Sequence, residues 1–229
     1  MASIFEPSLP TPDLSHLTRA DYEHVYEPAE DTFLLLDALE KDAQELRQLK
    51  PQVCLEIGSG SGCVSSFLGA LLPSSSALYL CTDINQHACR CTKATGSQNK
   101  VTLEPIIASL ASPLQHRLAN QIDILVFNPP YVPTTSDEAD AAQVTSGISG
   151  AWAGGKSGME LTNILLSSVP KLLSPGGRFY LVGVVQNGVE EIRQRMRQAH
   201  GLDSEIVLER RAGRERLWVV KFFKAAAPS

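Results

Sequence analysis

VCLEIGSGSG, residues Val53–Gly62, decides the fold, because a short apolar run ends there in three glycines at alternate positions. Glycine accepts positive φ and lets a ligand approach the backbone, so the pattern is typical of a strand-to-helix turn in a nucleotide-binding sheet. Asp83 ends the next apolar run, where such sheets place an acid for ribose hydroxyls. Cys63 occupies the third glycine position of a dinucleotide turn, which weakens that interpretation. A purely structural glycine turn is the alternative.

Outward from this turn, strand-like and helix-like segments alternate along the chain. Strands are predicted at 77–84, 101–107, 123–128, 177–185, 204–211 and 216–223, and helices at 30–46, 85–98, 160–173 and 188–200. The alternation predicts an α/β fold. Its sheet should be seven-stranded, mostly parallel and Rossmann-like, with helices on both faces and a C-terminal antiparallel strand pair. Residues 1–20 are expected to form a flexible arm, 21–224 a single domain and 225–229 a flexible tail.

Composition and charge exclude several classes of protein. The 229 residues carry a net charge of −5, and their one basic cluster spans 210–216, which argues against a grip on a long nucleic acid. No apolar run approaches the roughly 20 residues of a membrane span, and the N-terminus does not resemble a signal peptide. Five cysteines without such a signal favour reduced thiols and a cytoplasmic, or also nuclear, location. Cys89-x-Cys91 lacks zinc-knuckle spacing, so no metal is expected in this chain.

A polar, glycine-rich segment at 134–158 interrupts the alternation. Loops of this length in compact domains are usually functional or disordered, so we expect it to cover the substrate. Within it, Gly150–Ser157 matches the letters of a phosphate-binding P-loop. No buried strand precedes that match, so we do not interpret it as a phosphate site.

The run DILVFNPPY, residues 123–131, ends a predicted strand in a motif suited to methyl acceptance by an NH2 group. A residue before proline is extended, so the side-chain oxygen of Asn128 and the carbonyl of Pro129 can accept both hydrogens of one planar NH2 group. Tyr131 offers a flat face for the attached π-system. Holding both N–H bonds would localise the nitrogen lone pair toward an electrophile, here a methyl sulfonium. We therefore expect Asn128, Pro129 and Tyr131 to be catalytic; a double-proline strand terminator is the alternative.

With Glu56-x-Gly-x-Gly-x-Gly, Asp83 and Asn128-Pro-Pro-Tyr131 in this order, the chain resembles class I S-adenosylmethionine (AdoMet)-dependent methyltransferases. It resembles the HemK-type glutamine N5-methyltransferases most, and VYEPAEDTFLLLDAL (25–39) and AWAGGKSG (151–158) match their eukaryotic release-factor branch. The resemblance implies methylation of the glutamine in the Gly-Gly-Gln motif of the class 1 translation release factor, with S-adenosylhomocysteine as the other product. It also implies a heterodimer with a small zinc-binding activator that covers an apolar sheet edge. Our candidate for that edge is Val101–Ile107.

The resemblance also implies the site residues. Cofactor-binding residues would be Thr32, Glu56, Gly58, Gly60, Gly62, Asp83, Ile84, Ser109, Leu110 and Asn128, and substrate-binding residues Asn128, Pro129, Pro130, Tyr131 and Val132. Relatives commonly have an acid where this chain has Ser109, whose hydroxyl would accept more weakly from the adenine amino group.

Three other functions fit part of the pattern. The first is a DNA adenine-N6 methyltransferase, because adenine also presents a conjugated NH2 group to such a site. That enzyme must flip a base and hold flanking DNA, which the net charge of this chain disfavours. Some HemK relatives are described as protein lysine methyltransferases. A catalytically idle scaffold that binds AdoMet or only a partner is the third, and the intact Asn128, Tyr131 and Asp83 argue against it.

Overall fold

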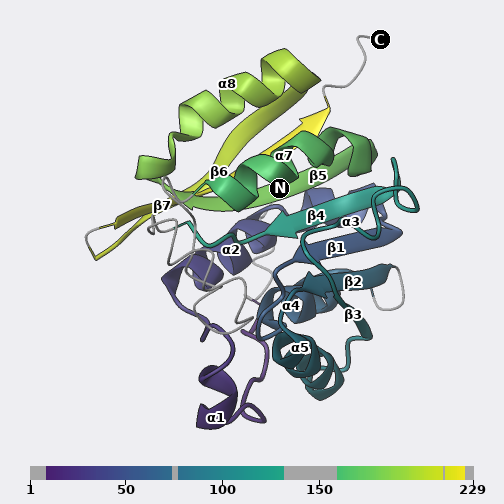
Figure 1. Ribbon diagram of the computed structural model, residues 1–229, viewed down its shortest axis with the longest axis vertical. Coiled ribbons are helices and arrows are strands. Elements are labelled where there is room, and N and C mark those ends of the chain that lie inside the picture. The colour runs from purple at the N-terminus through teal and green to yellow at the C-terminus, as the bar shows by residue number, and fades with distance from the viewer. Residues whose placement is uncertain (1–8, 74–76, 132–158, 214, 225–229) are drawn as a thin grey trace, which may run out of the picture.

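The computed structural model describes residues 9–73, 77–131, 159–213 and 215–224. Figure 1 shows one sheet with helices on both faces. The strand order is β3-β2-β1-β4-β5-β7-β6, and its strands are Val53–Ile57 (β1), Leu78–Asp83 (β2), Leu103–Ile107 (β3), Ile122–Phe127 (β4), Leu173–Val184 (β5), Leu202–Ala212 (β6) and Glu215–Lys224 (β7). The pairs from β3 to β5 are parallel, whereas β7 pairs antiparallel with both β5 and β6. This confirms the predicted fold class.

The helices divide between two apolar cores. Their bounds are Arg19–Tyr22 (α1), Glu30–Lys41 (α2), Ala43–Leu49 (α3), Cys63–Leu71 (α4), Gln86–Gln98 (α5), Glu160–Leu172 (α7) and Val189–His200 (α8), with a 3-10 turn at Val185–Asn187 (η2). Neighbouring strand residues face opposite sides, so on β1 Cys54 joins one core and Leu55 the other. Helices α2, α3 and α4 pack into the first core, and α7 and α8 into the second. The sheet is therefore covered on both faces, as parallel strands require.

A break at Asp42 separates α2 from α3 in the segment that the sequence predicts as one helix, 30–46. The Asp42 carboxylate accepts from the Tyr180 hydroxyl at 2.7 Å and lies 2.9 Å from the Lys221 ammonium. Lys221 is only 3% exposed and also meets Glu45 and Glu205 at 2.6 and 2.9 Å. Burial alone would lower the pKa of Lys221, but the hydrogen bonds to these acids raise it above its ordinary value. The break thus coincides with an acid that pairs this buried cation.

Residues 9–18 are attached to the domain, which differs from the expected flexible arm over 1–20. The backbone N–H of Asp13 donates to the Asn99 side chain at 2.7 Å, and the His16 ring lies 3.1 Å from the Thr95 hydroxyl. Both partners lie at the end of α5, so tertiary contacts fix a segment whose composition favours a loop. The domain boundaries at 21 and 224 stay predictions.

Two predicted features lie outside the described residues: the loop at 134–158 and Val132. Within the described part of the chain, no helix is long and apolar enough to cross a membrane. β3 lies at one edge of the sheet, where the sequence analysis places the partner interface. Leu78, Ile84 and Ile107 expose apolar side chains on or beside β2 and β3, and Ile107 is 57% exposed.

Candidate active site

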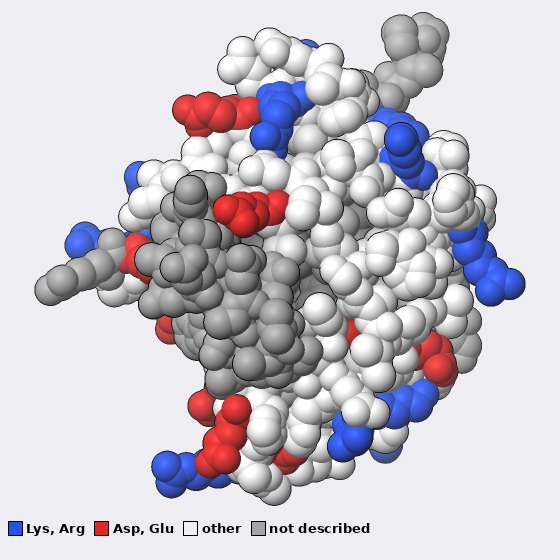
Figure 2. Space-filling view, in the orientation of Figure 1, with Lys and Arg blue, Asp and Glu red and all other residues white. Residues whose placement is uncertain are grey.

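A cleft opens at the carboxyl ends of β1, β2 and β4. Its walls include the glycine turn after β1, Asp83 at the end of β2 with Asn85 after it, Asn128–Tyr131 after β4, and residues of the segment from His24 to Thr32. Parallel sheets place ligands at this end. On the face shown in Figure 2, Lys and Arg side chains lie scattered toward the margins, and the described residues there form no continuous basic surface.

The glycine turn is held in a left-handed conformation by the sheet below it. Gly58, Gly60 and Gly62 have φ values of 69°, 51° and 78°, a region that side chains disfavour. The N–H of Gly58 donates to the Thr82 carbonyl at 2.7 Å, and that of Gly60 donates to the Asp83 carboxylate at 3.0 Å. A Cβ on Gly60 would meet no atom within 4 Å, so the described residues leave open space beside the turn.

Two acids lie beneath the turn in poorly solvated positions. Glu56 is 6% exposed, and one carboxylate oxygen accepts from the N–H of Ser65 at 3.0 Å and from its hydroxyl. Burial, opposed by those bonds and assisted by the charge of Asp83, raises the pKa of Glu56 to about 8. Burial likewise raises the pKa of Asp83, despite donors from the backbone of Asn85 and Gly60. A cationic ligand would relieve both costs, because an opposite charge favours the ionised form.

Asp31, in the first turn of α2, is a site residue that the sequence analysis missed. It is 4% exposed, and its Oδ1 accepts from the Thr32 N–H at 2.7 Å and the Tyr26 hydroxyl at 3.0 Å. Its Oδ2 accepts from Asn128 Nδ2 at 3.0 Å and the Tyr131 hydroxyl at 3.1 Å. The only signal in the sequence is an acid beside Thr32, which is equally typical of any helix N-terminus.

Asn128, which lines the cleft, has an acceptor without a hydrogen-bond partner among the described residues. Its Nδ2 is occupied by Asp31, while its Oδ1 is buried and has no hydrogen-bond partner among the described residues. Buried acceptors are rarely left unpaired, and such an exception calls for an explanation. Pro129 follows directly and is buried, and the Asn187 side chain donates to the Tyr131 carbonyl at 3.3 Å. The segment is therefore fixed from both sides, with one oxygen left available for a ligand.

Comparison with known proteins assigns the family. Residues 29–146 match the methyltransferase small domain model. The mouse protein "Methyltransferase HEMK2" is 48% identical over 219 residues, which cover 96% of this chain and 99% of the relative. The chain belongs to the HemK-type methyltransferases.

Other relatives of this methyltransferase agree with that assignment. The Schizosaccharomyces pombe "eRF1 methyltransferase catalytic subunit mtq2" is 42% identical over 225 residues, covering 94% of this chain and 96% of the relative. The E. cuniculi Mtq2 structure, solved as an Mtq2-Trm112 complex, aligns with a TM-score of 0.63 at 25% identity, covering 88% of this chain and 99% of that one. A T. thermophilus 16S rRNA methyltransferase in complex with AdoMet and guanosine aligns with a TM-score of 0.61 at 16% identity, covering 87% of this chain and 44% of that one, which shows the shared fold. As a member of this methyltransferase family, the enzyme uses AdoMet as its methyl donor.

The methyltransferase cleft brings together most of the residues that the sequence analysis named. Nearly all the described ones line it: Thr32, Glu56, Gly58, Gly60, Asp83, Ile84, Ser109, Leu110, Asn128, Pro129, Pro130 and Tyr131. Gly62 does not, because it packs against α5, where an added Cβ would lie 2.7 Å from the Thr92 Cα. Its role is to let the turn approach that helix. Ser109 is exposed at the rim, and its carbonyl accepts from the Ser112 N–H at 3.2 Å.

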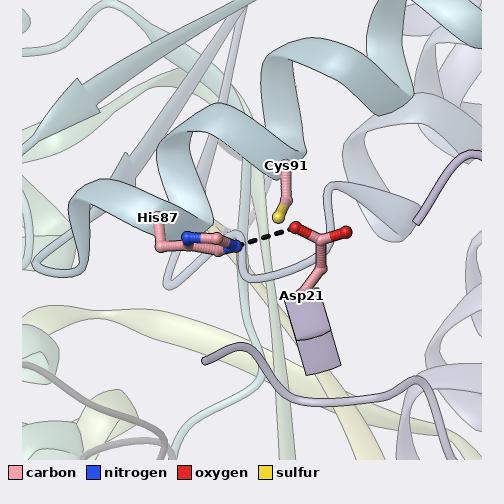
Figure 3. A group of neighbouring side chains, drawn as sticks. All are labelled: Asp21, His87 and Cys91. Carbon is pink, nitrogen blue, oxygen red and sulfur yellow. Dashed lines mark hydrogen bonds and ion pairs between the residues drawn. The ribbon is translucent and has the colours of Figure 1, made fainter. Parts of the chain in front are cut away.

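One cluster outside the cleft wall has the donor atoms of a metal site. Asp21, His87 and Cys91 each offer a ligand atom, and all three atoms lie within 4.8 Å of one another (Figure 3). The Asp21 carboxylate already meets His87 Nε2 at 2.9 Å, and burial, with the Asp21 charge, raises the pKa of Cys91 to about 11. A metal would have to displace that bond and ionise that thiol. The contact that the structure does show ties α1 to α5 beside the cleft.

Proposed function

We propose that this methyltransferase transfers a methyl group from AdoMet to the side-chain amide nitrogen of a protein glutamine. The substrate glutamine would be that of the Gly-Gly-Gln motif in the class 1 translation release factor. The observation that carries the proposal is the buried, unpartnered Oδ1 of Asn128 among the described residues. A primary amide brings two donors on one nitrogen, and it can satisfy that oxygen together with the neighbouring Pro129 carbonyl.

Asn128 and Pro129 act by orientation. With both N–H bonds held, the nitrogen lone pair points out of the amide plane toward the donor methyl group. Tyr131, whose hydroxyl is fixed on Asp31 at 3.1 Å, supplies the face against which the amide stacks. Pro130 and Val132 extend the substrate-binding segment. The N–C bond would form as the methyl–sulfur bond breaks, and the methylated nitrogen, now strongly acidic, would release one N–H proton to solvent. No base is needed before attack, so the residues that serve the amide are acceptors.

The cleft fits AdoMet by its donor and acceptor chemistry. When bound, AdoMet supplies an electrophilic methyl group on a positively charged sulfur. Glu56 and Thr32 would hold its methionine part, Asp83 its ribose, and Ile84, Ser109 and Leu110 its adenine. The open space beside Gly60 and the burial of Glu56 and Asp83 support this arrangement, because a cationic ligand offsets their desolvation. The other product would be S-adenosylhomocysteine.

A small zinc-binding activator is the partner we propose, in a heterodimer that uses the β3 edge. The named Mtq2 relatives support this, because one is called a catalytic subunit and another was solved with Trm112. Ile107 at the end of β3 is 57% exposed, whereas Ile106 is half-buried and packs against the second core. Ile107→Lys is therefore the cleaner probe, and it should abolish co-purification with the activator without loss of folding. The protein would work in the cytoplasm, where translation terminates.

The alternatives are less well supported by the site. Lysine at neutral pH is an ammonium without a lone pair, so it would need a base beside the acceptors. Adenine also offers a conjugated NH2 group, but the net charge of −5 disfavours binding to the DNA backbone. A DNA adenine-methylation assay with the same enzyme preparation separates this second candidate.

The deciding experiment is a radiolabelled methyl-transfer assay on the full-length release factor, with and without co-expressed activator. We expect label on the wild-type factor in the presence of the activator, and none when the glutamine of the Gly-Gly-Gln motif is replaced. Label that persists after this replacement would overturn the glutamine assignment.

A further inference from the structure

We propose that Asp31 is a positioning residue for methyl transfer: its carboxylate holds the Asn128 amide so that the oxygen, and not the NH2 group, faces the substrate nitrogen. The inference rests on the proposed function and deepens it. It concerns a residue outside the Asn128–Tyr131 motif, separated from Asn128 by 97 positions in the chain.

An asparagine side chain has two orientations of nearly equal shape and opposite chemistry. One presents an acceptor to the cleft and the other presents two donors. A substrate amide nitrogen also carries two donors, so the second orientation would set donor against donor. Packing cannot choose between orientations of equal shape, which leaves the hydrogen-bond partner on the other side of the amide to decide.

Asp31 makes that choice because an ionised carboxylate can only accept. Its Oδ2 lies 3.0 Å from the Asn128 amide nitrogen, so the flipped amide would place two oxygens against each other. The same Oδ2 accepts from the Tyr131 hydroxyl at 3.1 Å. One carboxylate oxygen therefore sets both side chains between which the substrate amide is expected to lie.

Asp31 is itself fixed from behind. Its Oδ1 accepts from the Thr32 N–H at 2.7 Å and the Tyr26 hydroxyl at 3.0 Å, and the residue is 4% exposed. With both oxygens occupied, the carboxylate has no alternative arrangement that keeps its donors. This preorganisation is what an acceptor needs if it is to orient a reacting group without rearranging during the reaction.

Asp31→Asn tests the choice of orientation at constant shape. The Thr32 and Tyr26 donors keep the oxygen of the introduced amide on their side, so its NH2 group turns toward Asn128. Asn128 then satisfies that NH2 group with its own oxygen and presents its NH2 group to the substrate. We expect kcat to fall on the order of 10²-fold, the scale of losing one oriented polar contact, with the KM for AdoMet and the melting temperature nearly unchanged.

An exchange of the two groups distinguishes orientation from simple structural support. In the double variant Asp31→Asn/Asn128→Asp, the introduced amide donates to the introduced carboxylate, which keeps an oxygen for the substrate. We expect the double variant to recover at least about 10-fold in kcat over Asp31→Asn, whereas Asn128→Asp alone, with two facing carboxylates, should be nearly inactive. A double variant no better than Asp31→Asn would overturn the proposal.

Asp123→Asn is the matched control, because Asp123 is a hydrogen-bonded carboxylate at the opposite end of β4. It should leave kcat unchanged. All variants are assayed as heterodimers on the full-length release factor. No transfer by the wild type would overturn the proposed function and this inference with it; wild-type transfer matched by Asp31→Asn would overturn the inference alone.

Discussion

Asp31 and Asp123 lie near opposite ends of the sheet. Both carboxylates accept several hydrogen bonds, but the two sets of bonds have different consequences. Asp123 lies near the amino end of β4 and accepts from the backbone N–H groups of Gln52 and Val53 at 2.7 and 3.1 Å, and from the Ser174 hydroxyl. These hydrogen bonds connect β1 and β5 to β4. Asp31 also accepts from one backbone N–H group, but one of its other donors, Asn128, carries a buried oxygen with no partner among the described residues.

The difference separates a carboxylate that stabilises the sheet from one that lies beside a binding site. A buried polar atom without a partner costs about 1–3 kcal/mol, a cost that Asp123 and its donors avoid because their hydrogen bonds are complete. At Asn128 the cost remains until a ligand supplies the missing donor. Of the two networks, the incomplete one includes Asn128, which lines the cleft, whereas the complete network of Asp123 joins three strands.

The strongest test of that division is Asn128→Ala. The substitution removes the unpartnered acceptor, so we expect kcat to fall by roughly 10²–10³-fold. Unfolding free energy should change by less than about 1 kcal/mol, because an unsatisfied polar atom is lost together with its bond to Asp31. AdoMet affinity, measured by calorimetry, should stay within a few-fold of wild type. Loss of AdoMet binding would mean that Asn128 serves the cofactor first.

The opposite result is expected for Asp123→Ala. Removing this carboxylate leaves the N–H groups of Gln52 and Val53 and the Ser174 hydroxyl without their acceptor. We expect a loss of about 1–3 kcal/mol in unfolding free energy, measured by urea denaturation, and unchanged kcat per folded molecule. Reduced kcat with unchanged stability would show that the two ends are not separate in function.

Much of the fold and part of the site follow from the sequence, because short contiguous motifs encode them. The glycine turn, Asp83 and Asn128–Tyr131 are contiguous signals at strand ends, and parallel strands bring such ends together. Asp31 could not be found this way, because its partners are chosen by tertiary contact across 97 and 100 positions. The break at Asp42 was missed for the same reason. The Asp42 carboxylate contacts Tyr180 and Lys221, which lie far away in the sequence.

Glu56 provides a pH test of the same comparison. Glu56 is 6% exposed, and burial raises its pKa from an ordinary 4.5 to about 8. The folded state then holds a proton that the unfolded state releases, so stability should fall as pH rises from about 4.5 to 8, by at most about 1.4 kcal/mol per pH unit. Glu56→Gln should flatten this slope in urea denaturation between pH 5 and 8. AdoMet should also flatten it, because a bound cation favours the ionised acid. An unchanged slope in the variant would assign the pH dependence to other groups.

The smallest expected effect on stability and binding is that of alanine at two glycines. Both have a left-handed backbone conformation, and they lie at opposite ends of the sheet. Gly60 has φ 51° in the cleft, and Gly201 has φ 63° between α8 and the start of β6. A Cβ on either would meet no atom within 4 Å, so alanine adds only left-handed strain, about 1 kcal/mol in each case. Both variants should lose similar stability in urea denaturation, but only Gly60→Ala should weaken AdoMet binding, because its Cβ projects where the ligand approaches the turn. Equal AdoMet affinity in the two variants would show that the ligand does not approach the backbone at Gly60, and that this glycine, like Gly62, serves the turn alone.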